Sequence, residues 1–363
     1  MRRPDRRSLN WLPALSWRRL LLALAGLAVA GLLLAWSGLI NIGASSGHWR
    51  ITNWALHWAM GNYTRTYALL EEAPPADLDD PARVRRAAGH FETACAFCHG
   101  SPARNWPILP ANMTPRPPAL DGSAEKWSPR ELSRIIRHGI KYTGMPAWIA
   151  RGRQDEVWAM VAFVRALPKM SAAEYRAMAF GPPVPDDPVL QGCARCHGTE
   201  GGSRAEGSMP GAFPVLAGQS EPYLMQSLRA FATGARHSAY MEFAVDGLDE
   251  TALARVARHY AGLPGLSEAA PAGESRGARI AREGLPQADV PACQSCHGAA
   301  ARRNPAYPRL GGQDATYLAD QLRAFKAGTR GGTSYGAIMR TIAERLEDED
   351  IAAVAQAYAG ARR

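Results

Sequence analysis

The chain has 363 residues, a net charge of +9 and 47% hydrophobic residues. This length allows two or three domains, and the ordinary hydrophobic fraction indicates a soluble globular body with an additional N-terminal segment. The positive charge alone is weak support for nucleic-acid binding and no motif adds to it, so no nucleic-acid partner is expected.

The N-terminal region carries a predicted transmembrane helix over residues 20–40, which are almost wholly apolar and hold no charge. About 20 apolar residues span a bilayer. Residues 1–19 form a basic segment with six arginines, which we expect to stay in the cytoplasm. Everything after residue 40 then lies outside the cytoplasm. The alternative, a signal peptide cleaved near Ala44, would export the same residues.

Residues 41–81 form a juxtamembrane segment and linker. They contain Trp49, Trp54 and Trp58, and tryptophan is enriched at membrane interfaces. A short helix on the outer membrane surface and a helix packed against the following domain both remain open.

Three Pro-rich stretches mark domain boundaries. They lie at residues 71–81, 181–188 and 264–275. The units that follow from them are unit one (82–170), unit two (171–264) and unit three (265–363). No unit shows sustained strand alternation, and residues 154–167 have the apolar spacing of an amphipathic helix. We therefore expect an all-α fold, with three tandem domains behind the membrane helix.

The motif C-x-x-C-H occurs once in each unit and uses all six cysteines of the chain. It is the attachment signature of a c-type haem, in which two thiols bond to the haem edge and the histidine reaches the iron. A zinc site would need two such pairs close in sequence, and a redox dithiol would not need the histidine. We predict three covalent haem c groups. The attaching residues are Cys95, Cys98, His99, Cys193, Cys196, His197, Cys293, Cys296 and His297.

Units two and three are copies of each other. Residues 213–236 and 307–330 align without gaps and are identical at 12 of 24 positions. Each copy ends in a predicted helix with an acidic start, which complements the helix dipole. Unit one is related but more distant.

The ligand opposite each histidine decides whether the iron is closed. Beyond Pro264 the chain has one methionine, Met339, which is the expected sixth ligand in unit three. In unit two Met241 follows the repeated block as Met339 does, and His237 remains the alternative. Met225 aligns with Ala319, so we expect it to pack in the core.

In unit one the sequence Gly144-Met145-Pro146 suits a loop that offers a thioether sideways. Met145 is the expected ligand and His138 its rival, whereas Met113 lies too near the motif. A metal-bound histidine usually donates its other ring N–H to a carbonyl. Each unit has a Pro-x-Leu sequence after its motif, which indicates the carbonyls of Pro118, Pro214 and Pro308. Simple loop packing beneath the haem is the alternative.

The positive charge is concentrated in unit one, which carries +8. This excess suits a docking face for an acidic partner or the compensation of haem propionates, and both interpretations stay open.

With these motifs, residues 82–363 resemble tandem class I cytochromes c. Units two and three resemble the dihaem cytochrome c4 type, through C-x-x-C-H-G, P-x-L-x-G-Q, L-R-A-F-x-x-G-x-R and the late methionine. Unit one resembles a mono-haem class I domain, through C-x-x-C-H-G and G-M-P-A-W. The resemblance implies small all-α domains with His/Met haems and electron transfer in the bacterial periplasm. Its typical partners are cytochrome bc-type complexes and terminal oxidases.

We therefore expect an electron carrier anchored in the inner membrane, with no catalytic residues. One alternative is the cytochrome subunit of a periplasmic dehydrogenase complex. Another is a haem peroxidase, which needs an open or His/His iron.

Overall fold

The computed structural model describes residues 16–104, 108–120, 122–184, 186–202, 211–300 and 303–361. Most of the basic segment 1–19 lies outside these residues, whereas every expected haem-site residue lies within them. The described chain is helical, and its only β contacts are three isolated bridges. The expected all-α fold is confirmed.

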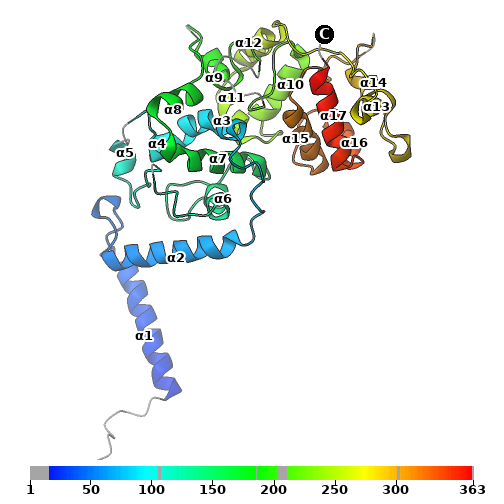
Figure 1. The fold of residues 1–363 in the computed structure, drawn as a ribbon. Coiled ribbons are helices and arrows are strands. Elements are labelled where there is room, and N and C mark those ends of the chain that lie inside the picture. The colour runs from blue at the N-terminus through cyan, green and yellow to red at the C-terminus, as the bar shows by residue number, and fades with distance from the viewer. Residues whose placement is uncertain are drawn as a thin grey trace, which may run out of the picture.

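Helix α1 (Trp17–Trp36) begins after Ser16, whose side chain accepts a hydrogen bond from the Arg19 backbone N–H. It is long and apolar enough to cross a membrane, and none of its residues is buried. Figure 1 shows it projecting away from the rest of the molecule. The helix ends at Trp36, so the last four residues of the expected 20–40 segment lie beyond it.

Helix α2 (Arg50–Ala68) has two halves with different surroundings. Trp49, Trp54 and Trp58 are exposed at and near its start. Gly61 and Thr64, further along, are buried, where α2 packs against α6 of unit one. The second half of the helix therefore packs on unit one, and the exposed tryptophans of the first half keep the membrane-surface alternative open. The helix lies beneath unit one in Figure 1.

Unit one is built around the contact between its first helix, α3, and a later helix, α7. Its helices are α3 (Pro81–His90), a π-helical turn (Phe91–Cys95), α4 (Ala96–His99), α5 (Ile108–Ala111), α6 (Pro129–His138), α7 (Gln154–Ala166) and α8 (Ala172–Ala179). Helix α7 confirms the helix expected over 154–167. Its sequence predicts one buried face, but every residue from Glu156 to Val164 is buried, because α3 and α6 both pack against it within the core of unit one and unit two covers Glu156.

Helix α8 begins after residue 170, where we expect unit one to end, yet it packs on α3 of unit one. The Tyr175 side chain is fully buried and donates a hydrogen bond of 2.7 Å to the Glu92 carboxylate. We therefore propose that unit one continues to the linker that begins at Gly181.

Units two and three repeat one arrangement. Unit two contains α9 (Pro188–His197), α10 (Glu221–Ala232), α11 (Ala239–Val245) and α12 (Glu250–Ala261). Unit three contains α13 (Arg276–Glu283), α14 (Gln294–His297), α15 (Ala315–Lys326), α16 (Gly336–Glu344) and α17 (Asp348–Gly360). Helices α12 and α17 confirm the expected closing helices. Asp249, just before α12, accepts a hydrogen bond from the Ala252 backbone N–H.

The three units touch one another, with unit two between the others (Figure 1). Units two and three exchange glutamine side chains: Gln219 bonds to both backbone groups of Arg309, and Gln313 to both of Val215. Arg86 of unit one donates to the Ala212 carbonyl of unit two. The same guanidinium lies 3.6 Å from Asp320 of unit three, so α3 contacts both copies.

Candidate haem sites

Each C-x-x-C-H motif lies on a helical turn that ends at its histidine. Helices α4, α9 and α14 end at His99, His197 and His297. In two of the units the next residue is a glycine with a positive φ, +72° at Gly100 and +71° at Gly198, a conformation that favours glycine. One tight turn therefore presents two thiols and one imidazole together.

Each motif histidine directs Nδ1 at a proline carbonyl. The distances are 2.8 Å from His99 to Pro118, 3.4 Å from His197 to Pro214 and 2.9 Å from His297 to Pro308. A carbonyl oxygen only accepts, so Nδ1 carries the proton and the Nε2 lone pair is left for a metal.

Burial keeps the three imidazoles neutral. It lowers the pKa of His197 to about 4, because the charged ring loses its hydration. Burial also lowers the pKa of His99 and of His297, although the proline carbonyls oppose this shift. Neutral imidazole is the form that binds iron.

The first thiol of each motif lacks the lowered pKa of a reactive dithiol. Burial raises the pKa of Cys95 to about 12 and those of Cys193 and Cys293 to about 11, whereas a reactive dithiol has a lowered thiol pKa. Within the described ranges, no group of three or more His, Cys, Asp or Glu side chains could hold a metal ion. Both observations disfavour the dithiol and zinc interpretations.

The buried apolar residues of units two and three each form two clusters. In unit two the buried residues divide into two clusters, one that includes Cys193 and Leu216 and one that includes Met241. Unit three also has two clusters, with Cys293 in one of them. The donor set of two thiols and a neutral imidazole in each unit fits haem c.

The three expected methionines are half-buried but differ in local structure. Met241 lies on α11 and Met339 at the equivalent place on α16, whereas Met145 lies in the loop between α6 and α7. Pro146 directly after Met145 explains the loop, because proline disfavours helix in the residue before it. Met225 packs against both clusters of unit two, as expected for a core residue.

The loop that carries Met145 is fastened to the end of α6. The Ile140 N–H donates to the Met145 carbonyl at 3.3 Å, and the Trp148 N–H donates to the Arg137 carbonyl at 3.1 Å. A Cβ added at Gly144 would lie 2.5 Å from the Cε of Met113. Met113, dismissed on its distance along the sequence, therefore lies beside the ligand loop, a placement that only the tertiary structure reveals.

The rival histidines take part in other interactions. The His138 ring lies 3.4 Å from the Glu71 carboxylate and 3.1 Å from the Arg134 guanidinium. His237 is exposed, with Nδ1 3.4 Å from the Glu242 carboxylate.

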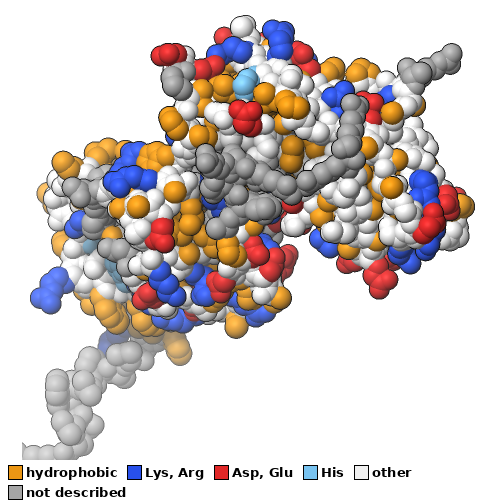
Figure 2. All heavy atoms as spheres, turned by 45° about the horizontal axis from the view of Figure 1, so that its top comes forward, with side chains coloured by type: hydrophobic (Ala, Val, Ile, Leu, Met, Phe, Trp, Pro, Cys, Tyr) orange, Lys and Arg blue, Asp and Glu red, His pale blue; other side chains and the backbone are white. Residues whose placement is uncertain are grey.

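The surface is mixed in charge. On the face in Figure 2, basic and acidic side chains are interspersed over all three units, and no continuous basic patch covers unit one.

Comparison with known families matches two parts of the chain. Residues 82–164 match the family described as "Cytochrome C oxidase, cbb3-type, subunit III", and residues 275–356 match the family "Cytochrome c".

Similar proteins include the "Thiosulfate dehydrogenase electron acceptor" of Thiomonas intermedia, 37% identical over 47% of this chain and 78% of that protein. Cytochrome c4 of Pseudomonas aeruginosa is 34% identical over 46% of this chain and 83% of its own length. The crystal structure of cytochrome c4 from Pseudomonas stutzeri covers 47% of this chain and 93% of that one, at 32% identity and a TM-score of 0.41.

The C-x-x-C-H turns, the family matches and the two sequence relatives agree: the chain belongs to the class I c-type cytochromes, with cytochrome c4-like domains, a family of electron-transfer proteins with covalent haem c.

Proposed function

We propose that this chain is a tri-haem electron carrier, anchored in the bacterial inner membrane with its haem units in the periplasm. The proposal rests on one observation that is repeated in each unit. The motif histidine bonds through Nδ1 to a proline carbonyl, which leaves its Nε2 atom for iron. Bound haem supplies one-electron redox chemistry. The chain supplies the attachment, the axial ligands and the exclusion of water.

The proposed iron ligands are His99 with Met145, His197 with Met241, and His297 with Met339. The ion-pair contacts of His138 and His237 support methionine in units one and two. Three closed irons leave no position for a substrate, which favours a carrier over a peroxidase.

The experiment counts methionine-ligated haems by their near-infrared charge-transfer band in the oxidised protein. Alanine in place of Met145, Met241 or Met339 should each remove about one third of the band, because each bond is one of three. Met225→Leu, a core change beside the haem of unit two, should leave the band whole. A wild-type band that corresponds to fewer than three methionine-ligated haems would contradict the closed sites and favour the peroxidase.

Membrane anchoring is supported by α1, which is long and apolar enough to cross a membrane and has no buried residue. Exposed tryptophans on α2 suit the membrane interface that a spanning α1 would place beside them. The full chain should therefore stay with membranes after washing in high salt, and a chain beginning at residue 41 should not. Release of the full chain by the salt wash would argue for a peripheral protein.

For partners we propose a cytochrome bc-type complex as donor and a terminal oxidase as acceptor. The match of residues 82–164 to a subunit of a cbb3-type oxidase supports the second of these. The relative from Thiomonas intermedia favours another candidate, an electron acceptor for a periplasmic dehydrogenase. Purification from membranes in mild detergent separates the two. A dehydrogenase that co-purifies in equal amount would establish the role as an electron acceptor for a dehydrogenase. A free protein that exchanges electrons with an oxidase would establish the role between a cytochrome bc-type complex and an oxidase.

A further inference from the structure

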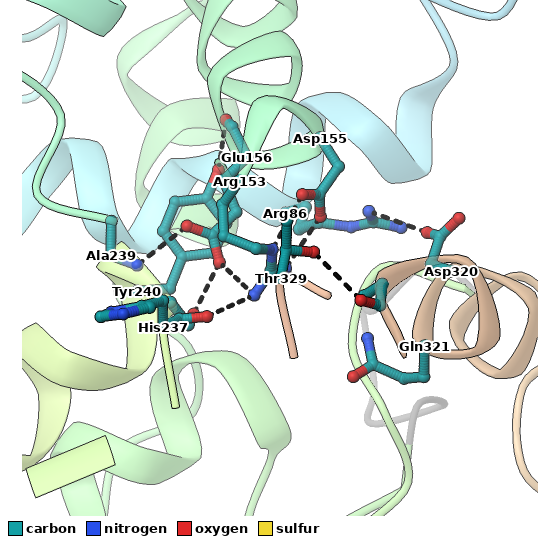
Figure 3. Close-up of polar contacts among 12 residues, drawn as sticks. Arg86, Arg153, Asp155, Glu156, His237, Ala239, Tyr240, Asp320, Gln321 and Thr329 are labelled. Carbon is teal, nitrogen blue, oxygen red and sulfur yellow. Dashed lines mark hydrogen bonds and ion pairs between the residues drawn. The ribbon is translucent and has the colours of Figure 1, made fainter. Parts of the chain in front are cut away.

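The contact between units one and two centres on one buried carboxylate. Glu156 lies on α7 of unit one, and its side chain is 1% exposed. Its Oε1 accepts a hydrogen bond of 2.6 Å from the Ser238 hydroxyl, and its Oε2 accepts one of 2.8 Å from the Ala239 N–H. Both donors belong to unit two. Figure 3 shows Glu156 beside Ala239 and Tyr240, with Arg153 close by.

The Glu156 carboxylate also reaches the ligand loop of unit one. The Trp148 indole N–H donates to Oε2 at 3.4 Å. Trp148 stands three residues after Met145, and its own backbone is fastened to α6. The indole therefore links Glu156 to the loop that presents Met145.

On the other side, a single hydroxyl separates Glu156 from Met241. Ser238 caps α11: its Oγ accepts a hydrogen bond of 3.3 Å from the Met241 backbone N–H while it donates to Glu156. The equivalent position in unit three is Gly336, and α16 has no side-chain cap. The cap of the ligand helix of unit two is thus bonded to a carboxylate of another unit, whereas the ligand helix of its copy begins without a side-chain cap.

The charge of Glu156 is compensated at the same place. Arg153 lies 3.1 Å from Oε1 and also donates to the His237 carbonyl at 2.9 Å. All four groups that bond to or pair with the carboxylate donate, which suits an acceptor-only side chain, and Arg153 opposes the rise that burial causes in the pKa of Glu156. A buried charge with such partners is costly to disturb, because its removal leaves donors unpaired.

We propose that Glu156 is a positioning residue that fixes the ligand segments of two haems at once, the Met145 loop through Trp148 and α11 with Met241 through Ser238. The inference rests on the proposed ligands. One carboxylate then sets the ligand geometry at the first and second haems, and the third haem is independent of it.

The test uses the ligand-methyl resonances of methionine in the proton NMR spectrum of the reduced holoprotein. Replacing Met145, Met241 and Met339 singly assigns them. In Glu156→Gln we expect the resonances of Met145 and Met241 to shift and that of Met339 to stay. We also expect imidazole to displace Met241 at about one tenth of the wild-type concentration, because a charge-assisted bond behind α11 is lost.

The matched control is Asp350→Asn. Asp350 is equally buried but pairs with Arg276 within unit three. It should leave the Met145 and Met241 resonances in place, so a shift at both sites in this variant would show that general destabilisation is being measured.

Two further variants separate the two connections of Glu156, one through Trp148 to the Met145 loop and one through Ser238 to α11. Ser238→Ala should shift Met241 alone, and Trp148→Phe should shift Met145 alone. Added to Glu156→Gln, Ser238→Ala should shift Met241 little further, because both changes break one chain of bonds. Full additivity would overturn the proposal, since Ser238 would then act only as a helix cap.

The outcomes distinguish the two proposals. If replacing a methionine removes no ligand resonance, that ligand assignment is wrong. If each replacement removes one resonance but Glu156→Gln shifts none, the ligands stand and the positioning role is wrong. Should Glu156→Gln fail to fold, Ser238→Ala and Trp148→Phe decide, and unchanged resonances in both would overturn the role.

Discussion

His90 occupies the centre of an aromatic cluster between units one and two. Its ring centroid lies 5.3 Å from that of Trp148, 5.1 Å from Tyr240 and 5.6 Å from Phe243. Burial lowers the pKa of His90 to about 4, because the protonated ring loses its hydration among these side chains. In the folded protein the ring stays neutral well below its usual titration range.

This lowered pKa predicts a pH-dependent stability. Below pH 6.5 the unfolded chain binds a proton at His90 that the folded chain does not bind, so the free energy of unfolding falls as the pH drops toward 4. The loss reaches up to about 3 kcal/mol. Urea unfolding of wild type and His90→Phe at pH 7 and pH 4.5 measures it. The variant should lose less stability between the two conditions, and equal losses would contradict this assignment.

At the scale of single residues, the sequence predicts the features whose residues lie close together along the chain. Cys95, Cys98 and His99 are close along the chain, so the motif is readable without a structure. A Pro-x-Leu sequence follows it in each unit, although the proline lies 19, 17 and 11 residues after the histidine. Glu156 carries no such signal. Its partners Ser238 and Ala239 lie in another unit, and their proximity depends on how two domains pack.

The crossing of α13 and α17 depends on a glycine. A Cβ added at Gly277 would overlap the backbone carbonyl of Ala353 on α17. Gly277→Ala should therefore destabilise unit three by about 1–3 kcal/mol, as overpacking does, despite the higher helix propensity of alanine.

The control for this prediction is Gly360→Ala on α17, where an added Cβ meets nothing within 4 Å. Thermal unfolding monitored by circular dichroism should show a lower midpoint for Gly277→Ala and no decrease for Gly360→Ala. Equal midpoints for Gly277→Ala and wild type would mean that the two helices separate readily.

Helix α2 is held to unit one by the carboxylate that follows it. Glu71 has a side chain only 2% exposed and lies 3.1 Å from Arg134, 3.2 Å from Arg137 and 3.4 Å from His138. Breaking a buried ion pair costs about 3–5 kcal/mol, and the partial exposure of Arg137 reduces that figure.

We expect Glu71→Ala to release α2 while the rest of unit one stays folded. Protease cleavage between residues 71 and 81 should become faster, because the end of α2 opens. Asp77→Asn is the matched control: Asp77 pairs with Arg83 nearby but is largely exposed, so its loss should change little. Unchanged cleavage in Glu71→Ala would show that packing alone holds the helix.

Whole helices were largely predictable and their surroundings were not. Apolar spacing predicts α7, and acidic starts predict α12 and α17. The same spacing predicts a single buried face for α7, because it cannot show that both α3 and α6 pack against the helix or that unit two covers Glu156. It also cannot assign α8 to unit one, because the decisive contact joins Tyr175 to Glu92 far earlier in the chain.

At the scale of the molecule, units two and three are joined by the exchange of Gln219 and Gln313. Gln219 accepts from the Arg309 N–H at 2.8 Å and donates to the Arg309 carbonyl at 3.1 Å. Gln313 makes both bonds to Val215 at 2.9 Å. Each side chain satisfies one backbone N–H and one C=O of the other unit, groups that are costly to leave unpaired.

Replacing both glutamines by alanine should separate the unfolding of units two and three. Each single change should cost about 2 kcal/mol through unpaired backbone groups. Scanning calorimetry should resolve an additional transition in the double variant. Gln191→Ala is the control, because Gln191 makes similar backbone bonds within unit two. It should lower stability without a new transition, and a single transition in the double variant would contradict the joining role.

The glutamine exchange has the self-complementarity of a homodimer contact, in which one surface pairs with a second copy of itself. Here residues 264–275 connect the two copies, so their pairing is intramolecular and independent of protein concentration. A true homodimer would impose every substitution on both partners. The fused pair allows Ser238 in one copy and Gly336 in the other, so unit one can support the capped ligand helix of unit two while α16 of unit three begins without a side-chain cap.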